Sequence, residues 1–535
     1  MIGKYEGGIR MGIYLNPDNV NFKGTLKADI YVDKTMMIDV INRFIEKENK
    51  YICVSRPRRF GKTIAGNMLA AYYSRGCDSR ELFRDLKIAE AKSFTEHLNR
   101  YNVIQIDLNS EYQNTEDKSK MICHLTRNIR KELRKEYPDV ELENDDGLAQ
   151  AILKVYDATG DRFIIILDEY DVLVREQADP KLFAEYLSLL NGLFKSNTLK
   201  PAIALAYLTG ILPIVRDKIQ SKLNNFREYT FLDAGELAEY IGFTENEVQE
   251  LCKRYDMDFE ECKRWYDGYA QQGVEIYNPE AVVQSMEKKK YGGYWGKTSS
   301  YEVISDQIRG NAFQTYDDVI RMLANENIPV DVEAYLNTMS GFSSKDDVFT
   351  YLIHLGYLAF DEDNNTCRIP NSEVRKEWIR SITRMSDYSK TDQIIRDSEE
   401  LLKETLAGNG EAVAAALDIS HIHVTSNRSY NNEDALQSAI YLAYIYALNK
   451  YTLIKEMTTG KGFADVLFIP YVPDIPALVI ELKRNGNADS AINQIREKKY
   501  FASLEHYSGN LLFVGIDYDE KKKTHTCRIE RFSKE

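Results

Sequence analysis

Short apolar segments alternate with longer, mixed polar and apolar segments over the first 213 residues of the chain. Four apolar strands are predicted, at 51–55, 102–108, 163–171 and 202–210. The helices between them are predicted near 62–75, 116–136, 146–158 and 181–196. Strands separated by helices of this length imply right-handed crossovers and a parallel sheet, and burial on both faces explains why the strands are continuously apolar. Residues 1–213 are therefore predicted to form an α/β domain.

The pattern becomes helical and charged after this domain. Residues 214–297 suit a small helical lid, and in "FTENEVQELCKRY" (243–255) a threonine precedes acidic residues, as at a helix N-cap. Residues 298–425 are predicted to form a helical middle domain. Within it, residues 346–382 are expected to form a helix, a short hairpin and a second helix. That order is compatible with a winged-helix-like unit.

Residues 426–535 return to a mixed pattern of helices and strands. A helix at 431–448 precedes strands at 451–457, 463–469 and 477–484, and a helix at 487–505 precedes a strand at 511–517. Glycine-containing turns separate these segments where strands should end. The predicted order is αβββαβ, and it defines a fourth domain.

Composition places the chain among soluble globular proteins. It has 535 residues, of which 44% are hydrophobic and 28% charged, and a net charge of −14. This charge argues against a protein that coats nucleic acid non-specifically, although a local basic groove stays open. The most apolar run, 201–215, contains two prolines and is shorter than the roughly 18 residues that span a bilayer. Seven scattered cysteines have neither zinc spacing nor a disulfide framework, and no secretory signal precedes them, so a cytoplasmic location is expected.

A phosphate-binding loop is indicated by "SRPRRFGKTIAG" (55–66), which follows one predicted strand and opens a helix. Gly61, Lys62 and Thr63 stand at the spacing that places backbone N–H groups, an amine for the outer phosphates and a hydroxyl for Mg²⁺ around a nucleotide. Arg56 stands where such loops have their first glycine, which weakens the match because the turn dictates the backbone angles there. The loop alone does not separate a nucleotide site from a charged strand-to-helix turn.

An acidic pair at the end of the third predicted strand shifts this balance. Asp168 and Glu169 follow four buried aliphatic residues, at the carboxyl end where ligands bind in open α/β sheets. Asp168 is expected to hold Mg²⁺ and Glu169 to orient and deprotonate a water. Thr209, at the end of the fourth strand, could contact the γ-phosphate or simply end that strand in a Thr-Gly turn. Loop and acidic pair together favour nucleotide binding.

A second site is predicted in "ALVIELKR" (477–484). Glu481 and Lys483 are two residues apart on a strand and share a face, while Asp465 on the preceding strand can lie beside Glu481. Two carboxylates and an ammonium group can bind Mg²⁺ and stabilise charge on a phosphate. The alternative is a solvated cluster of ion pairs. His421 and His423 would share a strand face, but no third metal ligand is suggested by the spacing.

Several motifs resemble a bacterial AAA-ATPase-like family whose members end in a PD-(D/E)xK nuclease-superfamily domain. The motifs are "YVDKTMMI" (31–38), "RPRRFGKT" (56–63), "LDEYD" (167–171), "LTGILPI" (208–214), "KLNNF" (222–226), "GYLAF" (356–360) and "RIPNSEVR" (368–375). The resemblance implies a P-loop NTPase sheet with a helical lid, a winged-helix-like middle region and a restriction-endonuclease-like αβββαβ domain. It also implies that the arginines are tolerated at a working loop.

The resemblance further assigns Glu433 to a supporting metal role and Gln494 to positioning metal or backbone. Phe463 departs from the family, which often has a basic residue there. Arg59 is expected to bind the nucleotide. Alternatively, Arg58 and Arg59 could contact a neighbouring subunit or acidic side chains of the lid.

The resulting functional hypothesis is an ATP- and Mg²⁺-binding ATPase coupled to a Mg²⁺-dependent nuclease domain that acts on nucleic acid, with DNA favoured over RNA and a homo-oligomer open. The alternative is a nucleotide-dependent switch or scaffold whose nuclease-like fold binds nucleic acid or protein without cleaving it. In a third variant, nuclease action requires oligomer assembly.

Overall fold

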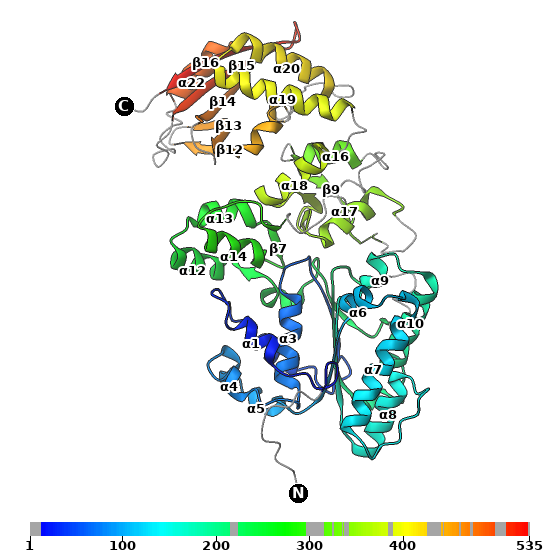
Figure 1. The fold of residues 1–535 in the computed structure, drawn as a ribbon. Coiled ribbons are helices and arrows are strands. Elements are labelled where there is room, and N and C mark those ends of the chain that lie inside the picture. The colour runs from blue at the N-terminus through cyan, green and yellow to red at the C-terminus, as the bar shows by residue number, and fades with distance from the viewer. Residues whose placement is uncertain are drawn as a thin grey trace. The chain divides into compact units, whose positions relative to one another are not determined.

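A computed structural model gives the fold (Figure 1). It describes residues 12–214, 223–295, 315–323, 326–333, 335, 342–383, 389–424, 440–441, 443–459, 462–470, 475–497 and 510–532. The chain divides into two compact units. The first contains Met1–Trp295 and Pro329–Asn371, and the second contains Gly296–Ile328 and Ser372–Glu535. The four predicted domain ranges stay predictions.

The helices and strands of the first unit lie in two long segments of sequence. Its helices are α1 (Val20–Thr25), α2 (Met37–Asn42), α3 (Lys62–Tyr73), α4 (Arg80–Phe83), α5 (Phe94–His97), α6 (Leu108–Asn114), α7 (Met121–Glu136), α8 (Leu148–Thr159), α9 (Val172–Arg175), α10 (Pro180–Phe194), α12 (Glu245–Tyr255), α13 (Phe259–Tyr266), α14 (Pro279–Lys288) and α17 (Lys345–His354). Its strands are β1 (Tyr51–Ser55), β2 (Asn102–Asp107), β3 (Phe163–Asp168), β4 (Ile203–Gly210), β5 (Arg227–Tyr229), β6 (Phe243–Thr244), β7 (Tyr269–Gln271), β8 (Val274–Tyr277), β10 (Ala359–Asp361) and β11 (Thr366–Arg368). Strand β9 (Ile328–Pro329) lies at the boundary.

The main sheet of the first unit is parallel and has the strand order β2-β3-β4-β1-β5. This confirms the predicted α/β fold, and the four predicted strands are present. Helices cover both faces, with α3 on one side and α7, α8 and α10 on the other (Figure 1). Ile165 and Leu167 belong to the core under α7, α8 and α10, whereas Ile166 lies 3.6 Å from the position of a Cβ built on Gly66 of α3. Because successive side chains enter opposite cores, every position of β3 before the terminal Asp168 is apolar.

Residues 223–295 add β5, three helices and a small antiparallel sheet with the order β6-β8-β7. The N-cap predicted in 243–255 is confirmed, because Thr244 and Glu247 form a capping box at the start of α12. The helix and hairpin predicted within 346–382 are also confirmed as α17, β10 and β11, with α18 (Ser372–Thr383) after them. The small sheet and β5 were not predicted.

The second unit contains a mixed sheet with the order β12-β13-β14-β15-β16. Only β14 and β15 are parallel neighbours, and the other pairs are antiparallel. The strands are β12 (Tyr451–Thr459), β13 (Gly462–Pro470), β14 (Ala477–Arg484), β15 (Leu511–Asp519) and β16 (Thr524–Phe532), and the helices are α16 (Thr315–Leu323), α18, α19 (Ser389–Ala407), α20 (Gly410–Val424) and α22 (Ala488–Glu497). The predicted strands and the crossover helix are present, and β16 is an additional edge strand.

Two expectations in this unit need comment. The prediction that His421 and His423 share the face of a strand is wrong, because both residues lie in α20. Residues two positions apart in a helix are separated by about 200° around its axis. Most of the helix predicted at 431–448 lies outside the described residues, and Ile445–Asn449 forms a 3₁₀ helix. Among the described helices, none is long and apolar enough to cross a membrane.

Candidate functional site

The loop between β1 and α3 turns the chain directly onto the N-terminus of the helix. Gly61 caps α3 in a left-handed conformation, with φ 96° and ψ 15°, and Arg59 has a φ of 67°. The ring of Phe60 is buried, with its centroid 5.6 Å from that of Phe231 and 5.8 Å from that of Tyr269. The first N–H groups of a helix lack partners within it, so this geometry favours an anion in front of the loop.

Arg56 lies under the loop rather than in front of it. It is 0% exposed, and its Nη1 donates to the backbone oxygens of Ser55, Tyr229 and Thr230 at 2.8, 2.9 and 2.8 Å. Burial lowers the pKa of Arg56 to about 10, so the guanidinium keeps its charge near neutral pH. The side chain therefore ties the start of the loop to the end of β5.

The amine of Lys62 is held by the loop itself. Its Nζ donates to the backbone oxygens of Arg56 and Pro57, both at 2.8 Å, and the residue is 7% exposed. Burial lowers the pKa of Lys62 to about 8, against the opposing effect of nearby Asp168 and Asp171. A lysine at this point of a phosphate loop can turn from the carbonyl oxygens to the outer phosphates of a nucleotide.

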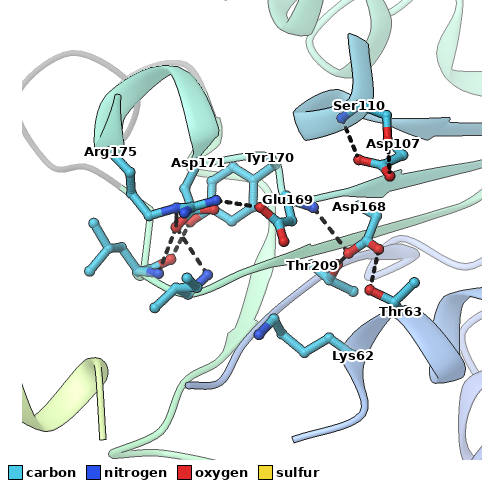
Figure 2. A network of polar contacts seen from close by, with 12 residues as sticks. Lys62, Thr63, Asp107, Ser110, Asp168, Glu169, Tyr170, Asp171, Arg175 and Thr209 are labelled. Carbon is cyan, nitrogen blue, oxygen red and sulfur yellow. Dashed lines mark hydrogen bonds and ion pairs between the residues drawn. The ribbon is translucent and has the colours of Figure 1, made fainter. Parts of the chain in front are cut away.

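Asp168 collects donors from three segments at the end of β3 (Figure 2). Its Oδ2 accepts a hydrogen bond of 2.6 Å from Thr63 Oγ1, and its Oδ1 accepts from Thr209 Oγ1 and, at 3.0 Å, from the backbone N–H of Glu169. Strand β4 lies between β1 and β3, so Thr209 ends between the loop and the acidic strand end. The fold thus brings Lys62, Thr63, Asp168 and Thr209 into one place.

Glu169 turns away from Asp168 and contacts α9. Its backbone is left-handed, with φ 53°, and its Oε2 lies 2.6 Å from Nη2 of Arg175. The Nε of Arg175 lies 3.3 Å from Oδ2 of Asp171, which also accepts backbone hydrogen bonds from Ile211 and Leu212. The sequence interpretation missed Asp171 and Arg175. The sequence signal for this pair was the spacing of four residues between Asp171 and Arg175, which places an acid and an arginine next to each other across one helical turn.

The two other arginines of the loop have different surroundings. Arg59 Nη1 lies 2.9 Å from Glu280 Oε1 at the start of α14, which is one of the alternatives left open by the sequence. Arg58 is exposed, and within the described residues its side chain has no hydrogen bond or ion pair. Its backbone oxygen accepts from Nε1 of Trp295 at 3.3 Å. Trp295 thus supports the backbone of the loop.

Asp107 is a further acidic residue at the same sheet edge. It pairs in register with Asp168 and caps α6, accepting hydrogen bonds from Ser110 N at 2.9 Å and Ser110 Oγ at 2.6 Å (Figure 2). The sequence analysis predicted the end of a strand near Asp107 and gave the aspartate no role. Because the carboxyl ends of neighbouring parallel strands meet at one edge of the sheet, the strand order could have suggested that Asp107 lies near Asp168.

The second predicted site lies where β14 meets α22. Glu481 is 1% exposed, and its Oε1 lies 3.4 Å from Nζ of Lys483. Gln494 of α22 donates to Glu481 Oε1 and accepts from Lys483 through its own Oε1. These three predicted residues are therefore in mutual contact. An acid and an ammonium group on a strand, held by an amide from a helix, can bind a cation and a phosphate.

Close packing of α22 on the sheet makes this contact feasible. Gly515 of β15 is the register partner of Glu481, and a Cβ built on it would lie 2.5 Å from the backbone oxygen of Ala488. Only a residue without a side chain allows the helix so near the strand. Asp517, next along β15 on this face, is buried and accepts from the backbone N–H of Gly486 at 2.8 Å.

The remaining predicted ligands lie partly outside the description. The backbone of Asp465 belongs to β13. Val466 pairs with Ile480, so in this antiparallel register the next position on each strand is Asp465 and Glu481. The side chain of Asp465 and the whole of Glu433 lie outside the described residues. Among the side chains that are described, no group of three acids, histidines or cysteines could hold a metal ion.

The fold defines a class: a protein with a parallel α/β domain that carries a strand–loop–helix candidate site, and with a mixed-sheet domain. Residues 21–220 match the family described as Predicted AAA-ATPase, and residues 431–527 match the PD-(D/E)XK nuclease superfamily. The chain therefore carries an AAA-ATPase-like domain towards its N-terminus and a PD-(D/E)XK nuclease superfamily domain towards its C-terminus. This confirms the resemblance inferred from the sequence motifs.

Similar proteins supply no further assignment. A protein of Azotobacter chroococcum mcd 1, named as an uncharacterized protein in the vnfD 5' region, is 22% identical over 512 residues, covering 92% of this chain and 94% of that one. The AMPPCP-bound DnaA from Aquifex aeolicus is 11% identical with a TM-score of 0.23, covering 77% and 95% of the two chains. The Aeropyrum pernix ORC1 protein in complex with DNA is 10% identical with a TM-score of 0.24, covering 94% and 100%. TM-scores this low carry no functional argument.

Proposed function

We propose that the protein binds ATP and Mg²⁺ at the loop between β1 and α3 and hydrolyses the ATP. The observation that carries this proposal is the 2.6 Å contact between Thr63 Oγ1 and Asp168 Oδ2. A loop threonine and an acidic strand end are the two protein ligands of Mg²⁺ in P-loop NTPases, and here they already adjoin. The donor set, one hydroxyl and one carboxylate beside a buried ammonium group, suits Mg²⁺ with a triphosphate.

The residues have separate tasks in this hydrolysis. Lys62 turns from the carbonyl oxygens of the loop to the β- and γ-phosphates, and Thr209 donates to the γ-phosphate. Bound Mg²⁺ supplies positive charge to the phosphate oxygens. Glu169 takes a proton from a water whose oxygen bonds to the γ-phosphorus, and the bond to the bridging oxygen breaks to leave ADP and phosphate. Arg59 contacts phosphate only after leaving Glu280.

The C-terminal domain is proposed to be a Mg²⁺-dependent nuclease of restriction-endonuclease-like fold. Glu481 and Asp465 would hold the cation, with Glu433 in support, while Lys483 stabilises charge on the phosphodiester and Gln494 fixes both side chains. The expected substrate is nucleic acid, with DNA favoured over RNA, inside the cytoplasm. A helical lid, a winged-helix-like middle region and a homo-oligomer belong to the same proposal.

Phosphate release from ATP by the full chain tests the first activity. We expect hydrolysis with Mg²⁺ that falls at least about 100-fold in Lys62→Ala and Glu169→Gln, because one removes phosphate contact and the other the base. Glu169→Gln should still bind ATP. Hydrolysis that survives in Lys62→Ala would contradict the proposed site.

Cleavage of labelled DNA and RNA by the full chain, with Mg²⁺ or Mn²⁺ and with or without ATP, tests the second activity. Glu481→Gln and Lys483→Met should abolish cleavage and leave ATP hydrolysis intact. Lys522→Met, which removes an exposed lysine from the turn after β15, is the matched control. If the wild type binds nucleic acid with ATP but never cleaves it, the switch or scaffold alternative holds.

A further inference from the structure

Glu169 is held by one of its two carboxylate oxygens. Its Oε2 lies 2.6 Å from Nη2 of Arg175, whose side chain is 8% exposed, and no donor within the described residues contacts Oε1 (Figure 2). A hydrogen bond between a guanidinium and a carboxylate is among the strong ones, so Oε2 is held on Arg175. Oε1 is left for a second partner.

Arg175 is itself held by a second carboxylate. Asp171 is 0% exposed, and its Oδ2 lies 3.3 Å from Nε of Arg175. The same oxygen accepts the backbone N–H groups of Ile211 at 3.0 Å and Leu212 at 2.9 Å, directly after β4. A charged group anchored by two backbone donors has little freedom to move. The position of Arg175 is thus fixed to the end of β4.

Close packing at this corner leaves no room for adjustment. A Cβ built on Gly210, the last residue of β4, would lie 2.5 Å from the ring of Tyr170 and 2.9 Å from Oδ1 of Asp171. Tyr170 also bonds to Leu212 O at 2.6 Å through its hydroxyl, and its N–H bonds to Thr209 O at 2.9 Å. The end of β4 therefore positions Thr209 and, through the N–H groups of the next two residues after the strand, Asp171 as well.

We propose that Arg175 is a positioning residue that holds Glu169 so that Oε1 faces the attacking water, with Asp171 as its anchor. This inference rests on the proposed hydrolysis of ATP by Glu169. A base that must meet a water beside a phosphate loses efficiency when its carboxylate can rotate among rotamers. Within the described residues, Arg175 has no hydrogen bond or ion pair with the loop between β1 and α3, and it reaches Lys62 only through its charge. We therefore expect it to act mainly on turnover rather than on ATP affinity.

Steady-state hydrolysis of ATP by the full chain separates this role from a merely structural one. Arg175→Met should lower kcat by about 10- to 100-fold, because Glu169 without its contact to Arg175 is misoriented. The KM for ATP should change by less than about two-fold, because the phosphate contacts stay. Arg175→Lys, which keeps one charged donor, should recover part of kcat. The double variant with Glu169→Gln should be no slower than Glu169→Gln alone, because both changes act through one group.

Arg75→Met is the matched control. Arg75 also contacts two carboxylates, Glu136 at 3.3 Å and Asp161 at 2.8 Å, but it follows the far end of α3, roughly 20 Å from Lys62 at 1.5 Å per residue. If Arg175 only stabilises the fold, both variants should lower the melting temperature and leave kcat of the folded protein unchanged. That result overturns the inference, as does a raised kcat in Arg175→Met. A wild type that hydrolyses no ATP would instead refute the proposed function itself.

Discussion

Replacement of Lys62 by methionine should abolish ATP binding and at the same time stabilise the nucleotide-free protein. The lysine is buried, and burial lowers its pKa from 10.5 to about 8. The unfolded chain keeps the ordinary pKa, so at neutral pH folding must bury a charge that water solvates better. Methionine has a similar length and no charge, so it removes this cost together with the phosphate-binding amine.

The expected gain follows from two opposing effects. A fall in pKa from 10.5 to about 8 corresponds to about 3 kcal/mol at a pH below both values. The carbonyl oxygens of Arg56 and Pro57 each lose a donor, which costs about 1 kcal/mol apiece. The net gain is therefore about 1 kcal/mol, or about 2–4 °C in the melting temperature of a domain of this size.

The pH dependence has a definite sign. Between pH 8 and 10.5 the unfolded chain keeps the proton of Lys62 and the folded protein has lost it, so the stability of the wild type rises with pH in this window. The advantage of Lys62→Met should be complete at pH 7 and should shrink towards pH 10. Other titrating groups are common to both proteins and cancel in the difference.

Thermal unfolding with and without ATP and Mg²⁺ measures these effects. Saturating ATP, at about 100 times its Kd, should stabilise the wild type by about 2.7 kcal/mol and leave Lys62→Met unchanged. Lys50→Met is the matched control, because Lys50 is also buried, has a pKa lowered by burial and donates to a carbonyl, that of Lys200, away from the loop. It should keep the response to ATP. A Lys62→Met protein that is less stable than the wild type at pH 7, or a difference independent of pH, would refute the reasoning.

Three further changes test other parts of the structure. Gly356→Ala places a side chain at a φ of 84° and within 3.0 Å of Pro57, in the loop between β1 and α3. It should lower the stability more than Gly408→Ala, where φ is 83° and the space is open. The free energies of unfolding of the two variants, obtained from thermal melts, should differ by about 1–3 kcal/mol. Gly515→Ala should push α22 from the sheet and abolish cleavage without affecting ATP hydrolysis, and full cleavage by this variant would contradict the packing argument. Arg59→Ala and Glu280→Ala should each lower stability by at most about 1 kcal/mol and to the same degree, whereas a rise in KM for ATP in Arg59→Ala alone would assign Arg59 to the nucleotide.

The parallel sheet was predictable because burial on two faces leaves a simple trace in the sequence. Strand β3 is apolar up to Asp168, and its end was identifiable from the acidic pair that begins with this residue. The unpredicted edge strands of the two five-stranded sheets, β5 and β16, lack this trace. Strand β5 has three residues, one of them exposed, and β16 alternates exposed and partly buried positions that include several charges. An edge strand contributes few residues to a core, so its pattern resembles that of a loop.

The arrangement of the proposed nucleotide site was predictable where its residues follow directly from strand ends. Thr63 and Asp168 were both assigned from local patterns, and the parallel order of the sheet brings them together. Arg175 was not assigned, because its importance depends on Asp171 accepting two N–H groups from residues 40 and 41 positions later. A contact between distant segments leaves no periodic signal. The same holds for residues 329–371, whose grouping with the first unit depends on tertiary contacts.

Arg56 shows how the loop between β1 and α3 can form without the first glycine of a phosphate loop. A glycine is required only where the backbone needs a positive φ or where another group comes too close for a side chain. The positive φ values of this loop fall on Arg59 and Gly61 instead, and Arg56 is not among the residues with such angles. Its side chain extends into the protein and satisfies three carbonyl oxygens at the end of β1 and after β5. The loop therefore has a buried cation at its base instead of a flexible first residue. The flexible position lies next to the helix, where Gly61 leaves the first N–H groups of α3 available to the phosphate that we propose.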